Sequence, residues 1–326
     1  MFDTITAAAH LGLQNLIAPA VLFFVLGMGA GFAKSDLALP PGAVKTFALY
    51  LMLCIGFKGG VEAAKAGFHT GFLHAGLAGF ALSLLMPLLT FPLFRTLGGL
   101  DRKTAAATAA AFGSVSVVTF ATGSDFLKAQ GVPFGGYMAA VLALMEAPAI
   151  LTGLLLARSR DGVHRGGDVL REVFLGGPAL VLAGSFAIGL ATGERGLAKL
   201  DLFVNPLFQG VLCLFLLEMG ITAAQSLNHA ARLPPRLLAL SLVLPLAGAA
   251  AGLALARLGG LSVGDATLVA LLAASASYIA APAAMRLALP EAQPGVYLGL
   301  ALGVVFPFNL ILGIPLYRMA AEHLMR

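Results

Sequence analysis

Long apolar segments make up most of this chain and restrict it to the interior of a membrane. Hydrophobic residues account for 59% of the sequence and charged residues for only 11%, with a mean hydropathy of +0.94. Soluble domains carry about 25% charged residues, and a helix needs about 20 mainly apolar residues to cross a bilayer. The sequence therefore predicts an all-α polytopic membrane protein with ten transmembrane helices, at residues 15–33, 43–60, 70–94, 104–123, 133–157, 172–192, 205–224, 236–257, 264–288 and 295–319.

Two of these apolar regions repeat one another. Residues 100–158 align with residues 261–319 without a gap, at a constant offset of 161 residues. The alignment places two serines of the first copy on two of the second: Ser114 on Ser275, and Ser116 on Ser277. Weaker similarity upstream extends the duplication towards the start of each half. Internal duplication of this kind is typical of secondary transporters.

The duplication divides the chain into three parts. We expect a first five-helix repeat at residues 1–157, a polar linker at 158–171 and a second five-helix repeat at 172–326. Because five is an odd number of spans, the second repeat enters the membrane with opposite polarity, which predicts an inverted repeat. Basic residues are more numerous in the loops on the side of the linker. This bias predicts an inner-membrane protein with the linker in the cytoplasm and both termini outside.

The paired serines lie in two short polar breaks, GSVSVVT and ASASYIAAP, inside apolar segments. Unwound backbone is tolerated at membrane depth only where it is buried in protein or lines a cavity. Freed carbonyls can bind a cation, while hydroxyls and helix N-termini suit a small oxyanion. The alternative is that small residues merely allow close helix packing, and the symmetry of the two breaks favours binding. The predicted substrate-binding residues are Ser114, Ser116, Thr119, Ser275, Ser277 and Tyr278.

Polar and ionisable residues inside predicted spans form a second group of candidates, because such residues are costly in a membrane and usually functional. Glu146 lies in the span after the first break. Lys58 and Glu218 lie on corresponding spans of the two repeats, where they could form an ion pair. Asn309 lies close to the repeat counterpart of Glu146. We expect these four residues to supply the coupling-ion site or a gate. The alternative for Lys58 is a position at the lipid headgroups, and for Glu218 a structural pair.

Other classes of function have little support in the sequence. The net charge of +5 is spread over short loops without a basic stripe, so we expect no nucleic-acid partner. Cys54 and Cys213 lie in apolar runs, and the histidines show no ligand spacing. We therefore expect no resident metal and no cofactor, with Na⁺ only as a coupling ion. Asp125 and Lys128 are interpreted as a solvated turn. Neither a catalytic constellation nor a repeated filter ring is present, which argues against an enzyme and against a passive channel.

Several motifs together resemble a known family. The motifs are IGFKGG, the FGSVSVVT break, LLEMG, ASASYIAAPAA and the run that ends in GIPLY. They are similar to the sodium-dependent bicarbonate transporters of the SbtA type, over essentially all ten spans. The resemblance implies two inverted repeats divided into a core domain and a gate domain, crossed broken helices at the substrate site, sodium coupling and a homotrimer. It maps the site of the family onto the serines of the two breaks and Thr119.

The chain departs from the pattern of this family inside the site. Val117 and Val118 replace a glycine and a serine, Tyr278 replaces an acidic residue, and Glu146 stands where the pattern has aspartate. A lost carboxylate weakens a sodium site at the second break, whereas the tyrosine adds a hydroxyl for the substrate. The linker is short, which leaves open whether a small cytoplasmic regulatory protein docks.

The sequence thus predicts a secondary active transporter that imports a small monovalent anion by sodium symport with alternating access. Bicarbonate is the first candidate substrate, and the expected partners are this anion, sodium and membrane lipid. The alternative is a proton-coupled or differently selective organic-anion permease on the same fold, which the absent acid at Tyr278 favours.

Overall fold

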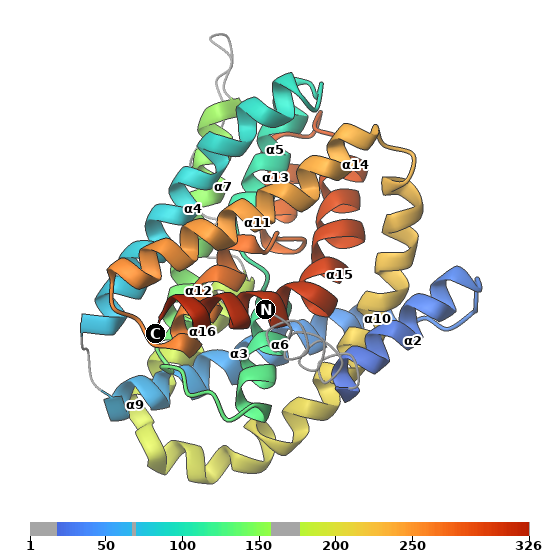
Figure 1. Cartoon of the computed structure of the whole chain (residues 1–326). Helices are drawn as coiled ribbons and strands as arrows, with labels where there is room; N and C mark the ends of the chain where they lie inside the picture. The colour runs from blue at the N-terminus through green and yellow to red at the C-terminus, as the bar shows by residue number, and fades with distance from the viewer. Residues whose placement is uncertain (1–17, 67–69, 158–176, 326) are drawn as a thin grey trace, which may run out of the picture.

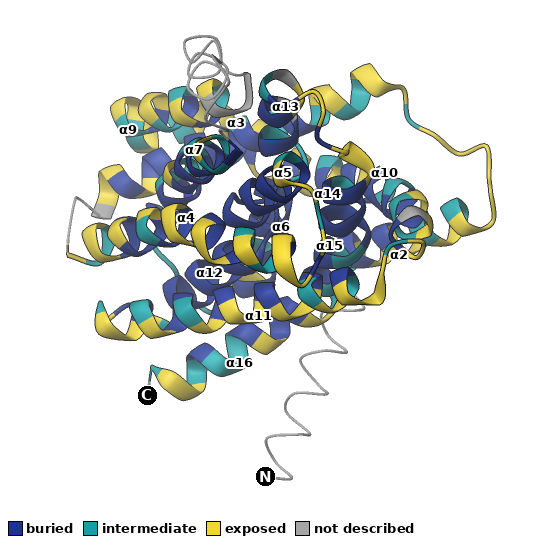
Figure 2. Cartoon of the chain, turned by 90° about the horizontal axis from the view of Figure 1, so that it is seen from above, coloured by how far each residue is buried: buried dark blue, intermediate teal, exposed yellow. Residues whose placement is uncertain are grey.

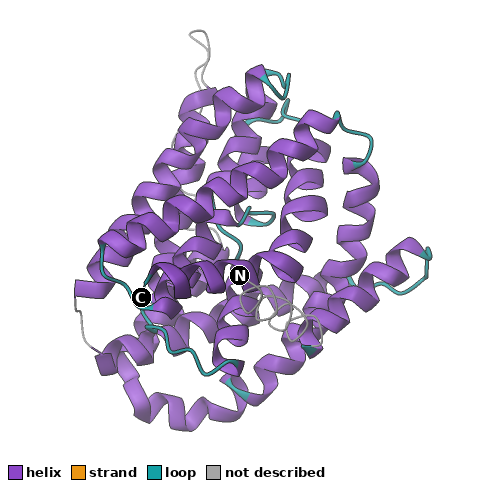
Figure 3. Cartoon of the chain, viewed as in Figure 1, coloured by secondary structure: helices purple, strands orange, loops and turns teal. Residues whose placement is uncertain are grey.

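The computed structural model describes residues 18–66, 70–157 and 177–325. All elements in this part of the chain are helices, as Figure 3 shows. The predicted linker at 158–171 and the start of the first predicted repeat lie outside the described residues.

The helices follow one another with short connections (Figure 1). Those before residue 158 are α2 (Pro19–Phe32), α3 (Pro41–Ala66), α4 (Thr70–Thr96), α5 (Arg102–Gly113), α6 (Val117–Ala129) and α7 (Met138–Ala157). Those after residue 176 are α9 (Gly177–Val204), α10 (Pro206–Ala230), α11 (Pro235–Leu258), α12 (Val263–Ala274) and α13 (Ala280–Ala288). The last helix is continuous but changes type: α14 (Pro294–Leu300), the π-helical η1 (Ala301–Val305), α15 (Phe306–Phe308), the π-helical η2 (Asn309–Gly313) and α16 (Ile314–Leu324).

Seven helices in the described part of the chain are long and apolar enough to cross a membrane. They are Pro41–Lys65, Thr70–Thr96, Arg102–Ala129, Met138–Ala157, Pro206–Asn228, Pro235–Leu258 and Pro294–Leu324. The predicted span 15–33 corresponds to the shorter apolar helix α2, and the predicted span 264–288 is divided into α12 and α13. The prediction of an all-helical membrane protein is therefore confirmed, while the ten-span arrangement stays a prediction.

The outer helices carry apolar side chains on the surface. On α4, the exposed residues Leu73, Leu77, Phe80, Leu84 and Leu88 recur at helical spacing. A continuous apolar stripe that faces outward is what a helix presents to lipid, because in water it would drive association. This pattern agrees with a protein that crosses the membrane several times.

The interrupted helix α5–α6 lies at the centre of the molecule, in contrast to α4. In the most apolar 18-residue stretch of Arg102–Ala129, every residue is buried. In the corresponding stretch of Thr70–Thr96, 44% of the residues are buried. Figure 2 shows α5, α6 and α12 as buried helices with more exposed helices around them. Surrounding protein can therefore satisfy the polar groups that an interruption frees, which a lipid-exposed helix could not do.

Glycines allow two pairs of helices to pack closely. On α3, a Cβ at Gly60 would overlap the carbonyl oxygen of Phe186 on α9. On α2, a Cβ at Gly27 would overlap the carbonyl oxygen of Leu217 on α10. Small residues at such positions permit backbones to approach within a membrane. Helix α9 bends at Gly193, whose φ of 55° is accessible to glycine at little cost.

The helices α5 and α12 begin and end at positions that differ by the offset of the sequence duplication, 161 residues. Each has a side-chain cap at its start: Asp101 Oδ1 accepts from the Thr104 N–H at 3.0 Å, and Ser262 Oγ accepts from the Asp265 N–H at 3.1 Å. Partial burial acts to raise the pKa of the Asp101 carboxyl, but hydrogen bonds from Thr104 and backbone N–H groups hold that pKa below its usual range. The two copies thus form the same local structure, a short capped helix that stops at a serine.

Candidate functional site

The first break separates α5 from α6 over Ser114–Ser116. Ser114 ends α5 with extended backbone, at φ −86° and ψ 176°. Ser116 begins α6 as its N-cap, because its Oγ accepts a hydrogen bond from the Thr119 N–H at 3.2 Å. The Thr119 hydroxyl donates to the same oxygen at 2.9 Å. All three residues are buried, so these side chains replace the water that would otherwise satisfy the helix end.

The second break also begins at a serine, but it is longer, because α13 begins only at Ala280. Ser275 ends α12 with extended backbone, at φ −79° and ψ 163°, and its hydroxyl donates to the carbonyl of Leu272 at 2.8 Å. Ser277 Oγ accepts from the Ala281 N–H at 3.2 Å, at the start of α13. Helix interruptions are therefore present within both predicted breaks, 113–119 and 274–282.

Hydrogen bonds join the two breaks to each other. The Ser116 N–H donates to Ser275 Oγ at 3.0 Å, and the Ser277 N–H donates to the carbonyl oxygen of Ala111 at 2.8 Å. In addition, α6 packs on α12 and α13 packs on α5. Figure 3 shows the short loops that interrupt the helices in the interior of the molecule. Each break thus supplies a polar partner for the backbone that the other break exposes.

A small cavity of about 10 Å³ lies between the breaks. Its polar lining comes from Ser116, Glu146, Ser277 and Tyr278. Glu146 is only 6% exposed, and none of the described residues donates a hydrogen bond to its carboxylate. The Tyr278 hydroxyl is also buried, lies close to Ser116 and has no hydrogen-bond partner among the described residues. Ser116, Ser277, Tyr278 and Glu146 therefore line one small cavity.

The other predicted residues of the breaks lie around this cavity and do not line it. Ser114 donates from its hydroxyl to the backbone carbonyl of Glu146 at 3.5 Å. Ser275 and Thr119 both form hydrogen bonds with Ser116. These three side chains position the cavity wall.

The side chain of Asn309 contacts the backbone at the start of the second break. This residue is fully buried at the start of the π-helical segment η2. Its side-chain NH₂ donates to the carbonyl of Ala274, the last residue of α12, at 2.8 Å. Its side-chain oxygen accepts from the Tyr317 hydroxyl at 2.9 Å. The amide of a π-helical turn thus bonds to a carbonyl at the break. Such turns are frequent at functional sites.

Lys58 and Glu218 lie away from the break cavity. The Lys58 ammonium lies over the ring of Phe208, 4.1 Å from its centroid. Glu218 accepts a hydrogen bond from the Leu39 N–H at 3.0 Å. The predicted Lys58–Glu218 ion pair is wrong for this structure, because each of these two described residues contacts a different group and no ion pair joins them.

Lys58 lines a second and much larger cavity, of about 610 Å³. Asp125 and Lys128 of α6 also line it, so the sequence interpretation of these two residues as a solvated turn missed their shared surroundings. They lie on one helical face with Ser124 and Phe120, a spacing that could have indicated this cavity. We call this larger cavity the vestibule. Its walls come from α3, α6, α7, α9, α10 and the segment between α6 and α7.

A buried aspartate holds one wall of the vestibule in place. Asp265 near the start of α12 accepts from the Gly135 N–H at 2.7 Å, the Tyr137 hydroxyl at 2.8 Å and the Ser262 hydroxyl at 2.7 Å. Three donors satisfy this carboxylate, which explains how a charge is tolerated at 5% exposure. Asp265 leaves no local signal in the sequence, because two of its partners, Gly135 and Tyr137, are more than a hundred residues away.

Comparison with known families identifies the superfamily of this chain. The family model of the Na⁺-dependent bicarbonate transporter superfamily matches residues 19–322. The chain belongs to this superfamily. The match spans both breaks and both cavities, so the predicted family resemblance is confirmed. Membership implies a membrane transport protein rather than an enzyme, with sodium-dependent bicarbonate transport as the activity of the superfamily. A comparison with curated proteins gives no match.

Proposed function

We propose that this superfamily member imports a small monovalent anion, bicarbonate first, by sodium symport with alternating access. The observation that carries the proposal is the reciprocal contact of the two breaks, Ser116 N–H to Ser275 Oγ and Ser277 N–H to the Ala111 carbonyl. Crossed broken helices at the centre of a membrane protein provide freed backbone groups and helix ends for both an anion and a cation. Superfamily membership supports bicarbonate and sodium as the two solutes.

The size of the break cavity supports a division of roles. A volume of about 10 Å³ admits one water-sized particle. A dehydrated sodium ion is of this size, and hard cations prefer oxygen ligands such as the Glu146 carboxylate and the hydroxyls of Ser116, Ser277 and Tyr278. Bicarbonate has four heavy atoms and needs more room. We therefore assign the cation to the present cavity and the anion to the same place after the cavity has widened towards the vestibule.

The mechanism that we propose uses the packing of the helices. The glycine-packed pairs α3–α9 and α2–α10 would form one rigid group, and α4–α7 with α11–α16 the other. The vestibule lies between α3, α9 and α10 on one side and α6 and α7 on the other. Movement of one group against the other would close the vestibule and open the break cavity to the opposite side of the membrane.

We also propose the finer topology that the duplication predicts. Helices α5 and α12 have the same length, and their bounds differ by the offset of the duplication. This agreement supports two inverted five-helix repeats, 1–157 and 172–326. In this topology the protein lies in the inner membrane with both termini outside and residues 158–171 inside. The homotrimer is proposed on the family resemblance.

A proton-coupled or differently selective organic-anion permease is the second candidate. The observation that favours it is the isolated carboxylate of Glu146 beside Tyr278. Ionisable side chains inside membrane spans often belong to proton relays. By contrast, a sodium ion beside this single carboxylate would need the neutral oxygens of Ser116, Ser277 and Tyr278 as its other ligands.

Uptake into proteoliposomes separates the two candidates. Labelled bicarbonate is measured with an inward sodium gradient, with an inward proton gradient and with potassium in place of sodium. Sodium symport predicts accumulation above the outside concentration only with the sodium gradient. Accumulation that follows the proton gradient would support the second candidate, and equilibration without accumulation would contradict both.

A further inference from the structure

The vestibule has a chemical character that the break cavity does not explain. We propose that it contains an outer binding site for a small oxyanion, in which Lys58 and Lys128 supply the charge. This inference rests on the proposed function for the identity of the anion, which we take to be the transported one. The outer site would gather the anion before the break cavity admits it.

The hydrogen-bonding state of the charged groups supports an anion site. The vestibule is lined by two lysines, Lys58 and Lys128, and by two acids, Asp125 and Glu62. Both acids have donors: Gln209 bonds to Asp125, and Lys65 bonds to Glu62 at 3.3 Å. Neither lining lysine has a carboxylate within ion-pair distance among the described residues. An ammonium group offers three donors, so each of the two lysines can donate to an anion in the vestibule.

Aromatic rings place both ammonium groups without neutralising them. Lys58 Nζ lies 4.1 Å from the centroid of Phe208, and Lys128 Nζ lies 5.8 Å from the centroid of Phe134. A cation over a ring is held weakly and keeps its charge and its N–H groups. A carboxylate-like or carbonate-like oxyanion matches two cations that keep their N–H groups.

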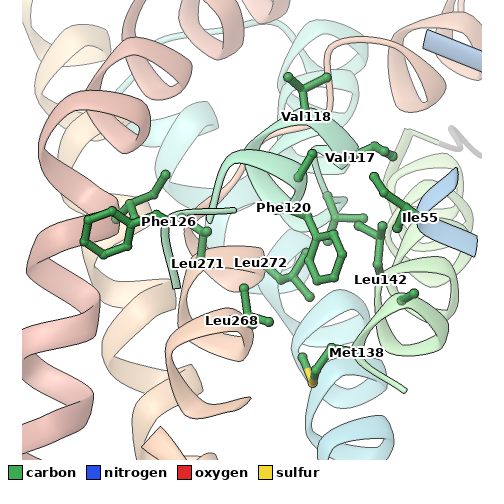
Figure 4. Packing of buried hydrophobic residues seen from close by; sticks show 14 of the residues in the cluster. Ile55, Val117, Val118, Phe120, Phe126, Met138, Leu142, Leu268, Leu271 and Leu272 are labelled. Carbon is green, nitrogen blue, oxygen red and sulfur yellow. The ribbon is translucent and has the colours of Figure 1, made fainter. Parts of the chain in front are cut away.

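One layer of apolar side chains separates the outer site from the break cavity. On α6, Val117 lines the break cavity and Phe120, one turn later, lines the vestibule. On α3, Met52 lines the break cavity and Ile55 lines the vestibule. Figure 4 shows Phe120 and Ile55 within the same apolar cluster. An anion held in the vestibule is therefore separated from the break cavity by these four side chains and must pass them.

Kinetics of labelled bicarbonate uptake into proteoliposomes test the outer site. Lys128 is exposed and has no ion-pair partner among the described residues, so Lys128→Gln is expected to fold normally. We expect Lys128→Gln and Lys58→Gln each to raise the KM on the order of three- to tenfold, with little change in kcat, because only capture is weakened. Lys128→Arg should restore most of the loss. Lys45→Gln, which removes the same charge from an exposed position of α3 outside the vestibule, should have no effect.

The sodium dependence distinguishes this inference from the proposed function. Sodium binds at the breaks in our proposal, so the sodium concentration that gives half-maximal uptake should stay the same in the lysine variants. An unchanged KM in both Lys58→Gln and Lys128→Gln would overturn the outer site and leave the proposed function standing. If the wild-type protein takes up no bicarbonate, the proposed function fails, and ¹³C NMR line broadening of bicarbonate by the purified protein decides the outer site. Broadening that Lys128→Gln abolishes would support it, and broadening that persists or is absent would overturn it.

Discussion

The backbone N–H of Ser116 donates a 3.0 Å hydrogen bond to the hydroxyl oxygen of Ser275. These residues are 159 positions apart, and each lies in the interrupted helix of one copy of the duplication. The same hydroxyl donates to the Leu272 carbonyl, so it serves both breaks at once. This oxygen atom is therefore one of the groups that join the two breaks.

Replacement of this oxygen should be costly. Ser275→Ala leaves the buried Ser116 N–H without an acceptor, and an unsatisfied buried group costs about 1–3 kcal/mol. Because the cavity wall shifts with it, we expect the rate of uptake to fall at least about tenfold, a factor that corresponds to about 1.4 kcal/mol. Ser241→Ala is the matched control, since this buried serine donates only to the Leu238 carbonyl of its own helix. Equal uptake by the two variants would contradict the role of Ser275.

Glu146→Gln should separate stability from coupling. The carboxylate receives no hydrogen bond from the described residues, so a neutral amide of similar shape should leave the melting temperature unchanged or raise it. The cation dependence of uptake should nevertheless be lost, whether the cation is sodium or a proton. Uptake by the variant is measured against sodium concentration and against pH. Glu322→Gln, which neutralises a carboxylate outside the break cavity that pairs with Arg318, serves as the control. A Glu146→Gln protein with normal cation dependence would exclude this residue from the coupling site.

Asn309→Ala tests whether Asn309 supports the backbone or binds the coupling ion. The change leaves the Ala274 carbonyl and the Tyr317 hydroxyl without partners, which should destabilise the protein by about 1–3 kcal/mol. Tyr317→Phe removes a hydroxyl but keeps the Ala274 contact, so its effect should be smaller. Both are measured as melting temperatures in detergent, together with the half-maximal sodium concentration. A supporting role predicts a loss of stability with unchanged sodium affinity in the protein that remains folded. Weaker sodium binding at normal stability would instead identify Asn309 as a ligand.

Gly60→Ala should weaken the contact between α3 and α9. The added methyl group would overlap the carbonyl of Phe186, and overpacking of this kind costs about 1–3 kcal/mol. Gly184→Ala on α9 is a strict control, because its Cβ would meet no atom within 4 Å. We expect a lower melting temperature for the first variant only. A similar decrease in both would mean that the close approach at Gly60 is not needed for stability.

The sequence predicted the positions of the two breaks well, because local chemistry determines them. Serines with extended backbone end both α5 and α12 at the positions that the duplication pairs. Sequence could not predict which of the four serines face the cavity. That choice depends on hydrogen bonds between distant segments, such as the contact of Ser116 with Ser275.

Long-range packing also explains two contacts of charged residues that the sequence did not indicate. The predicted pairing of Lys58 with Glu218 assumed that symmetric positions face each other. In the structure α3 packs mainly on α9, and Glu218 bonds to the connection after α2. Asp125 was interpreted as solvated because its partner Gln209 lies 84 residues later in the chain. Neither relationship leaves a periodic or local signal in the sequence.

We propose that solute binds where the two breaks cross. An electron cryo-microscopy map of the protein in sodium bicarbonate, compared with a map in the chloride salt of a large organic cation, can show such a solute. We predict density in the space bounded by Ser116, Ser277, Tyr278 and Glu146 in the first map and its absence in the second. An empty break cavity in both maps, at a resolution that shows the surrounding side chains, would contradict the claim.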